Sequence, residues 1–173
     1  MSDENGKPMD DLVKTIFDIA SQHDIKVALH IEPYKGRNPF NLRQNLQYIF
    51  DEYGQYSSFY RRNGKPVFYI YDSYLTPVKE WKKLLTRSGT FTIRTTALDA
   101  IFIGLIVEYK HRFSLQESGF DGFYTYFAAN GFSHGSTWKN WRGLANFARK
   151  NSLLFIPSVG PGYDDMRVRP WNG

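Results

Sequence analysis

The sequence contains no cysteine, which excludes two kinds of site at once. Without thiols, the chain can form neither a disulfide framework nor a thiolate metal site. It also lacks the H-E-x-x-H and H-x-x-x-H pairs that place two histidines on one zinc ion. We therefore expect no metal site in this chain.

Long apolar segments are missing as well. No window approaches the roughly 18 apolar residues of a membrane span, and residues 1–8 are polar, with no apolar signal-peptide core. These first residues are expected to be flexible. As written, the chain is expected to carry neither an anchor nor an export signal, and so to be cytoplasmic if it is made in this form.

No long run of one charge occurs. The formal charge of +5 comes from 22 Lys and Arg against 17 Asp and Glu, and the basic residues are dispersed. Nucleic-acid binding, which usually needs a clustered basic face, is therefore not expected. Aromatic residues, in contrast, are abundant at 17%. The 173 residues suffice for one domain with a substantial core.

Apolar runs alternate with amphipathic segments along the whole chain. The apolar runs predict strands at 25–31, 67–71, 101–107, 122–127 and 153–159. Helical spacing of apolar residues predicts helices at 10–20, 41–53, 78–85, 109–118 and 138–150. Near-continuous apolar runs suit strands that are covered on both faces of a parallel sheet. The alternation predicts an α/β fold with right-handed crossovers.

Missing motifs help to choose among α/β folds. The stretch HIEPYKGRN, after the first predicted strand, contains neither G-x-G-x-x-G nor G-x-x-x-x-G-K. A parallel (β/α) barrel of TIM type is therefore favoured over a nucleotide-binding doubly wound sheet. No G-x-S-x-G elbow occurs, which argues against a serine hydrolase. A complete barrel has eight βα units and about 250 residues. This chain has 173 residues and five predicted units, so the predicted barrel is incomplete.

Polar side chains follow the predicted strands. In chain order they are His30, Glu32 and Tyr34; Asp72, Ser73 and Tyr74; Glu108; Tyr124, Tyr126 and Asn130; and Ser158, Tyr163, Asp164 and Asp165. The carboxyl ends of barrel strands meet at one face, where barrel enzymes carry their sites. Tyrosine rings pack on the C–H faces of sugars, and glycoside hydrolysis usually needs two carboxylates. The set predicts a carbohydrate site.

Each acid also has a purely structural interpretation. Glu32 alternatively faces solvent at a strand end, and Asp72 alternatively bonds the backbone of its turn. Glu108 is favoured as the first residue of a helix, with Lys110 and Arg112 nearby. His23 and His111 are expected to be exposed at helix ends. His30 lies within an apolar run and is expected to be a hydrogen-bonded core histidine. The alternating tyrosines at 69, 71, 124 and 126 are expected to contribute in part to the barrel packing.

Several long segments resemble the glycoprotein endo-α-1,2-mannosidases of glycoside hydrolase family 99. They are DENGKP at 3–8, KVALHIEPYKGR at 26–37, PVFYIYDSYLT at 66–76, GFDGFYTYFAANGFSHGS at 119–136, and FIPSVGPGY with RVRPWN at 155–172. The resemblance implies a (β/α)8 barrel of the Golgi secretory route that needs no metal or cofactor. It also implies hydrolysis, with retention, of internal α-1,2-mannosidic bonds in glucosylated N-glycans, so the partner is a mannose-containing oligosaccharide.

Site residues follow from the same resemblance. Glu32 of HIEPY corresponds to a ligand of a substrate hydroxyl, and Tyr126 of YTYF to the tyrosine beside the reacting carbon. The further substrate-binding candidates in matching segments are Tyr34, Asp72, Asn130, Tyr163 and Arg169. The family's acid and base are glutamates of an N-E-W-x-E motif, which does not occur in the 173 residues. The resemblance therefore assigns no catalytic residue to this chain.

The chain resembles strands three to seven of the eight-stranded barrel. It is expected to be inactive alone and at best marginally folded, because an open sheet has two unpaired edges and an inner face without partners. One hypothesis is an endo-α-mannosidase represented by a truncated product or a partial gene model. The alternatives are a non-catalytic carbohydrate-binding or interaction protein with the same fold, and a product without function.

Overall fold

A computed structural model describes residues 10–127, 129–160, 166–167 and 170–172. Its sheet has five parallel strands in chain order. They are β1 (Leu29–Ile31), β3 (Lys65–Ile70), β4 (Ile101–Leu105), β5 (Gly122–Tyr124) and β6 (Leu154–Ile156). Each of these strands pairs with its predecessor, as consecutive units of a barrel do, so the predicted parallel α/β arrangement is confirmed. In the described part of the chain, β1 and β6 form the two edges.

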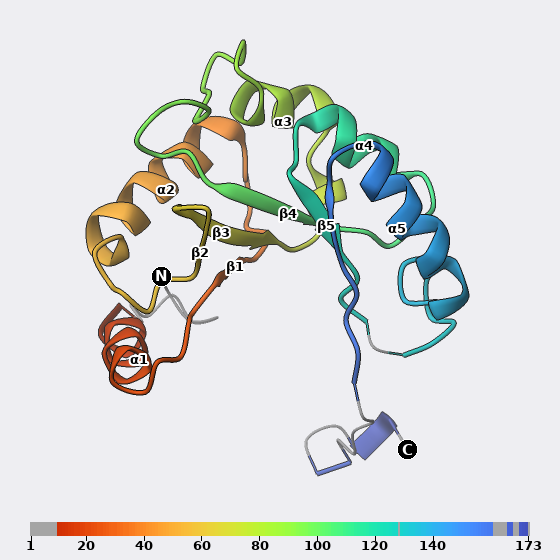
Figure 1. The fold of residues 1–173 in the computed structure, drawn as a ribbon, viewed down its shortest axis with the longest axis horizontal. Helices are drawn as coiled ribbons and strands as arrows, with labels where there is room; N and C mark the ends of the chain where they lie inside the picture. The colour runs from red at the N-terminus through yellow and green to blue at the C-terminus, as the bar shows by residue number, and fades with distance from the viewer. Residues whose placement is uncertain (1–9, 128, 161–165, 168–169, 173) are drawn as a thin grey trace.

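The five predicted helices are all present. They are α1 (Asp10–Gln22), α2 (Pro39–Tyr53), α3 (Val78–Leu85), α4 (His111–Ser118) and α5 (Trp141–Lys150). Three short 3-10 segments accompany them: η1 (Ser73–Leu75), η2 (Trp138–Asn140) and η3 (Pro170–Asn172). Figure 1 shows α2, α3, α4 and α5 in an arc along one face of the sheet. Within the described ranges, no helix is long and apolar enough to cross a membrane.

The strands are shorter than the apolar runs that predicted them. Before β1, Val27 makes only an isolated parallel bridge to Phe59. After β4 and β5, the apolar run continues beyond the last ladder pair, Leu105 with Tyr124. Val107 and Tyr126 lie in these extensions of the apolar runs. Val107 packs against the inner face of the sheet and Tyr126 contacts Tyr71, and neither residue belongs to a strand ladder.

A short hairpin was not predicted. Strand β2 (Arg61–Arg62) pairs antiparallel with the start of β3. The two residues between the strands, Asn63 and Gly64, both have a positive φ, at 51° and 77°. Asn-Gly is the preferred pair for such a turn, because both residues tolerate the left-handed conformation. The signal was therefore present in the sequence.

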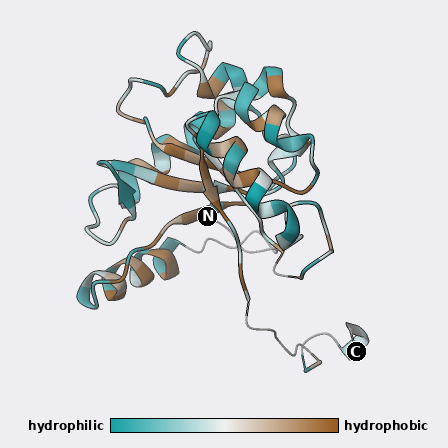
Figure 2. Cartoon of the chain, turned by 45° about the vertical axis from the view of Figure 1, so that its right-hand side comes forward, coloured by the Kyte–Doolittle hydropathy of each residue, from teal (hydrophilic) through white to brown (hydrophobic). Residues whose placement is uncertain are grey.

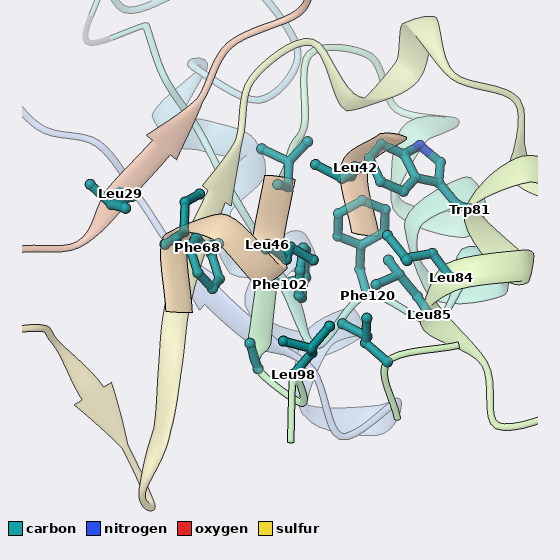
Figure 3. Close-up of a cluster of buried hydrophobic side chains, with 14 of the residues drawn as sticks. Leu29, Leu42, Leu46, Phe68, Trp81, Leu84, Leu85, Leu98, Phe102 and Phe120 are labelled. Atoms are coloured by element: carbon teal, nitrogen blue, oxygen red, sulfur yellow. The ribbon is translucent and has the colours of Figure 1, made fainter. Parts of the chain in front are cut away.

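The larger core lies between the sheet and the helices. Figure 3 shows side chains of α2 and α3 against those of the central strands. Leu42 and Leu46 from α2, Trp81 from α3, and Phe68 and Phe102 from the strands belong to one buried cluster. Figure 2 shows apolar strands beneath helices whose outer surfaces are largely hydrophilic. Burial of this apolar layer provides the main driving force for folding.

A smaller apolar cluster, here called the inner-face cluster, covers the opposite side of the strands. Its buried members are Val67, Ile103, Leu105 and Tyr124, and Tyr69 and Tyr71 pack against it among other partly buried residues. Neighbouring strand residues such as Phe68 and Phe102 belong to the larger core instead. Side chains alternate between the faces of a strand, so both faces of this sheet are apolar. Tyrosines 69, 71 and 124 pack on the inner face, as expected.

His111 contradicts its expected exposure. Its ring is buried and stacks on Tyr74 with 4.8 Å between the ring centroids. Its Nδ1 accepts hydrogen bonds from the backbone N–H groups of Val107 and Glu108, at 3.3 and 3.2 Å. The prediction was wrong because the loop after β4 folds back over the ring. His23, in contrast, is exposed as predicted.

We expect His111→Asn to weaken the pH dependence of stability. Burial lowers the pKa of His111 below its usual value of 6.5. Above this value the ring is neutral in both the folded and the unfolded chain. Below it, the unfolded chain takes up the proton first, so stability falls as the pH falls. Asparagine offers a carbonyl oxygen near the place of Nδ1 and does not titrate.

The measurement is urea unfolding of both proteins at about pH 7.5 and about pH 5. His111→Asn should lose less stability than the wild type between the two pH values. His23→Asn, which changes an exposed histidine, is the matched control and should follow the wild type. An unchanged pH dependence in His111→Asn would contradict the prediction.

Candidate functional site

The centre of the site is a chain of hydrogen bonds between two strand ends. Oε1 of Glu32 lies 2.8 Å from Nδ1 of His30. Nε2 of the same ring lies 2.6 Å from the hydroxyl oxygen of Tyr124, which is 94 residues further along the chain. His30 belongs to β1 and Tyr124 to β5, and β3 and β4 lie between these strands in the sheet. The bonds therefore bridge the concave inner face.

Three tyrosine rings surround His30. Tyr71 and Tyr126 lie 5.3 and 5.9 Å from the imidazole, between ring centroids, and the Tyr126 ring is nearly parallel to it. Tyr124 meets the imidazole edge-on at 5.8 Å. Tyr71 and Tyr126 also contact each other at 4.8 Å. Tyr126 is half exposed, so part of its ring remains available beside the hydrogen-bonded acid.

Asp72 follows β3 in a left-handed conformation, with φ of 44°. Its Oδ1 accepts a hydrogen bond of 2.7 Å from the Tyr74 hydroxyl. Its side chain does not cap the following 3-10 turn, so the interpretation of Asp72 as a turn-bonding residue is not supported. The Arg37 guanidinium instead donates to the backbone carbonyls of Tyr71 and Asp72, at 2.9 and 2.7 Å. These bonds connect the loop after β1 to the end of β3.

Burial and the nearby carboxylates raise the pKa values of three tyrosines at the site. Burial, followed by the charge of Glu32, raises the pKa of Tyr124 far above its usual value of 10. Burial and the hydrogen bond to Asp72 raise the pKa of Tyr74 to about 12. Burial also raises the pKa of Tyr71, with smaller contributions from Asp72 and Glu32. These phenols therefore keep their protons at neutral pH, and the Tyr74 hydroxyl donates its proton to Asp72.

The remaining candidates lie in different surroundings. The Tyr34 hydroxyl donates to Asn41 and accepts from Asn45, so it is fastened to α2. Oδ1 of Asn130 accepts from the backbone N–H of Trp138 and holds its own loop. Glu108 lies three residues before α4, which begins at His111, so it is not the first residue of the helix, and it pairs with Lys110 at 2.9 Å. Tyr163, Asp164, Asp165 and Arg169 lie outside the described residues.

Sequence reasoning thus found Glu32 and Asp72 but missed their supporting residues. His30 was expected to be a hydrogen-bonded core histidine. Its hydrogen bonds are confirmed, but its side chain is 31% exposed and does not lie in the core, and its link to Glu32 was not predicted. The spacing of two residues on an extended strand, which places both side chains on one face, was the available signal. No sequence signal pointed to Arg37. In the described part, no group of three or more His, Cys, Asp or Glu side chains is placed to hold a metal ion.

A histidine-bound acid beside tyrosine rings, at the carboxyl ends of the strands of a parallel sheet, lies where (β/α) barrel enzymes carry their sites. The comparison with known families agrees with this class. The model of glycosyl hydrolase family 99 matches residues 1–173, and the chain belongs to that family.

Relatives show which part of such a protein this chain corresponds to. The chain is 53% identical over 177 residues to a glycoprotein endo-alpha-1,2-mannosidase-like protein of Mus musculus. It is 52% identical over 176 residues to the glycoprotein endo-alpha-1,2-mannosidase of Rattus norvegicus. Each alignment covers 99% of this chain but only 39% and 38%, respectively, of the relative. The chain therefore spans well under half the length of these relatives.

A solved structure gives the same result for the fold. The GH99 endo-alpha-mannosidase from Bacteroides thetaiotaomicron superposes with a TM-score of 0.87 at 48% identity. The superposition covers 93% of this chain and 47% of the bacterial chain. The prediction of an incomplete barrel is therefore confirmed.

Proposed function

We propose that this chain binds mannose-containing N-glycan oligosaccharides as part of an endo-α-1,2-mannosidase barrel. The reaction of the whole barrel would be hydrolysis of internal α-1,2-mannosidic bonds of glucosylated N-glycans, with retention, in the Golgi. The chain would supply the units that resemble strands three to seven. Support comes from the family membership and from the relatives named as endo-alpha-1,2-mannosidases.

One observation carries the proposal within the structure: an exposed acid is held beside an exposed aromatic ring. The Glu32 side chain is 64% exposed although His30 holds one of its oxygens. Among the described residues, no partner is recorded for the other oxygen, and we propose that it accepts a hydrogen bond from a sugar hydroxyl. The half-exposed ring of Tyr126, stacked on His30, offers a face for sugar C–H groups. Asp72 is a second acceptor at the end of the neighbouring strand.

Binding without cleavage is the proposed behaviour of the 173-residue chain itself. The acid and base of the resembled family are glutamates of N-E-W-x-E, and this motif is not in the sequence. The same observation favours the alternative, a non-catalytic carbohydrate-binding protein with this fold. Mass spectrometry of the incubated oligosaccharide separates binding from turnover. A released saccharide would contradict the proposal that this chain does not cleave.

Glu32→Gln is expected to weaken binding of an α-1,2-linked mannotriose by about tenfold, since one charge-assisted hydrogen bond is replaced by a neutral one. Isothermal titration of the wild-type chain and of the variant with this trisaccharide measures the change. The physical reason is that the amide has a single acceptor oxygen and cannot serve His30 and the sugar equally well.

Glu117→Gln is the matched control, because it makes the same chemical change at an exposed residue of α4 that pairs with Lys82. Its affinity for mannotriose should equal that of the wild type. Absence of binding by a wild-type chain that unfolds cooperatively would overturn the proposed function. Equal affinities of the wild type and Glu32→Gln for mannotriose would show that Glu32 does not contact the sugar.

A further inference from the structure

The hydrogen bond between His30 and Glu32 indicates which nitrogen of the imidazole ring carries a proton. A carboxylate oxygen only accepts hydrogen bonds, so the 2.8 Å contact between Oε1 of Glu32 and Nδ1 of His30 requires the proton on Nδ1. A neutral imidazole that donates through Nδ1 has an acceptor at Nε2. The Tyr124 hydroxyl lies 2.6 Å from that atom. For a neutral ring, the contact with Glu32 thus selects the Nδ1–H tautomer.

Tyr124 is well suited to donate this bond. The residue is only 4% exposed and packs within the inner-face cluster. Its ring also meets Tyr69 edge-on at 5.2 Å, which restricts its movement. In the described part of the chain, no hydrogen bond other than the one to His30 is recorded for its hydroxyl. The hydroxyl is therefore available to donate to Nε2 of the Nδ1–H ring, and the bonds then run in one direction from Tyr124 through His30 to Glu32.

Glu32 depends on His30 for a fixed orientation of its side chain, whereas Asp72 is bonded by Tyr74 instead. Within the described ranges, His30 is the hydrogen-bond donor that the structure records for the Glu32 carboxylate. A mostly exposed glutamate side chain without such a bond samples several rotamers, and ordering it on binding costs free energy. The imidazole itself is fixed by Tyr124 at one end and by the rings of Tyr71 and Tyr126 on its sides. His30 therefore transmits the rigidity of the buried inner face to the exposed acid.

We propose that His30 is a positioning residue that holds Glu32 in the orientation for accepting a sugar hydroxyl, in the Nδ1–H form selected by Glu32 and Tyr124. The functional part of this inference rests on the proposed sugar binding at Glu32. The positioning itself is a property of the chain without ligand. The two parts can therefore be tested separately.

Two substitutions separate positioning from packing. His30→Asn places an amide nitrogen near the position of Nδ1, so it keeps a donor for Glu32 and loses the partner of Tyr124. His30→Gln places its amide one bond further along, near Nε2, so it keeps a partner for Tyr124 and loses the donor for Glu32. Both replace an imidazole by a primary amide, and each serves as the control for the other.

We expect His30→Asn to bind the α-1,2-linked mannotriose within about threefold of wild type. We expect His30→Gln to bind about tenfold more weakly, as Glu32→Gln does, since each loses about one hydrogen bond at the acid. If His30 only fills space, both variants lose affinity equally. Equal affinities of the two variants would overturn the positioning role.

Nitrogen-15 NMR of the ligand-free wild-type chain at about pH 7.5 tests the proton assignment directly. The expected result is a proton on Nδ1, and a ring that carries its proton on Nε2 alone would overturn the inference. This measurement tests the position of the proton even if the wild-type chain fails to bind mannotriose. In that case the proposed function fails, whereas an Nδ1–H ring still supports the positioning of Glu32 by His30.

Discussion

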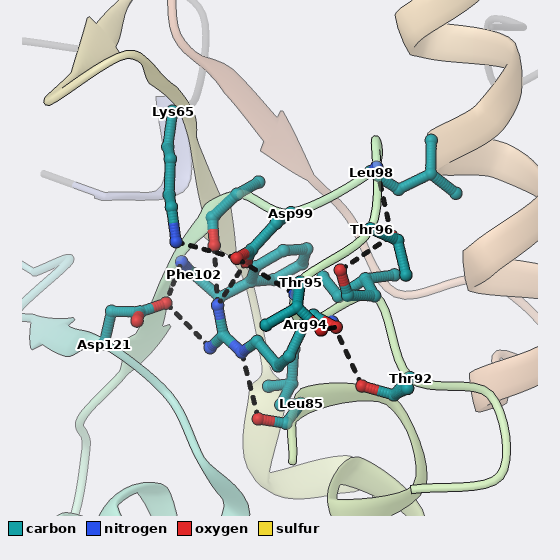
Figure 4. Close-up of polar contacts among 12 residues, drawn as sticks. Lys65, Leu85, Thr92, Arg94, Thr95, Thr96, Leu98, Asp99, Phe102 and Asp121 are labelled. Carbon is teal, nitrogen blue, oxygen red and sulfur yellow. Dashed lines mark hydrogen bonds and ion pairs between the residues drawn. The ribbon is translucent and has the colours of Figure 1, made fainter. Parts of the chain in front are cut away.

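Arg94→Met is expected to lower the free energy of unfolding by about 3 kcal/mol or more, the range for breaking a buried ion pair. The Arg94 side chain is only 12% exposed. It pairs with Asp99 at 3.2 Å and with Asp121 at 2.9 Å (Figure 4). Methionine has a similar length and no charge, so the variant leaves two partly buried carboxylates without this cation.

Backbone groups add to the expected loss. Arg94 also donates to the carbonyls of Leu85, Ala100 and Gly119, at 3.0, 2.7 and 2.7 Å. These residues come from the end of α3, the approach to β4 and the turn after α4. The side chain thus connects three segments beside the amino ends of β4 and β5. Each carbonyl left without its donor is destabilising if water does not reach it.

Urea unfolding followed by circular dichroism measures the change. Arg87→Met is the matched control, because Arg87 lines the same surface depression but is exposed. It should stay within about 0.5 kcal/mol of the wild type. Arg94→Lys keeps the charge without the planar set of donors and should fall between wild type and Arg94→Met. An Arg94→Met midpoint equal to that of Arg87→Met would show that the pairs contribute nothing.

Phe68→Ala is expected to cost about 3–5 kcal/mol, the usual effect of removing a buried aromatic side chain. Phe68 is 0% exposed and lies on β3, an interior strand of the sheet. Its ring contacts those of Phe50, Phe59 and Phe102, with centroids 6.3, 5.8 and 5.6 Å away. The cavity would lie between the sheet and α2, where the strands have little freedom to move inward because their other face is also packed.

Thermal and urea unfolding of Phe68→Ala give the size of this loss. Phe132→Ala removes the same atoms from a side chain that is 67% exposed and should change stability by less than about 1 kcal/mol. Phe68→Leu, which refills part of the volume, should recover some of the loss. Equal stabilities of Phe68→Ala and Phe132→Ala would contradict the assignment of Phe68 to the core.

Much of the fold was predictable because it depends on local patterns. The helical spacing of apolar residues predicted all five helices, and the continuous apolar runs predicted the five parallel strands. The ends of the strands were less predictable. Val107 and Tyr126 extend the apolar runs, but they pack against other side chains instead of pairing with a strand. Packing and strand pairing produce the same apolar pattern in the sequence, so the pattern does not show where a strand ends. The burial of His111 depends on a loop that folds back on it, which no periodicity records.

By itself, the sequence determined the parallel α/β fold and the presence of Glu32 and Asp72 at strand ends, because both follow from residues close together in the chain. Only the tertiary structure decided what holds these acids. His30 meets Tyr124 across two intervening strands, and Arg37 reaches the carbonyls of Tyr71 and Asp72 from another loop. Such contacts join residues that lie 34 to 94 positions apart in the chain. They depend on which strands become neighbours in the sheet, and this has no signature within a short stretch of sequence.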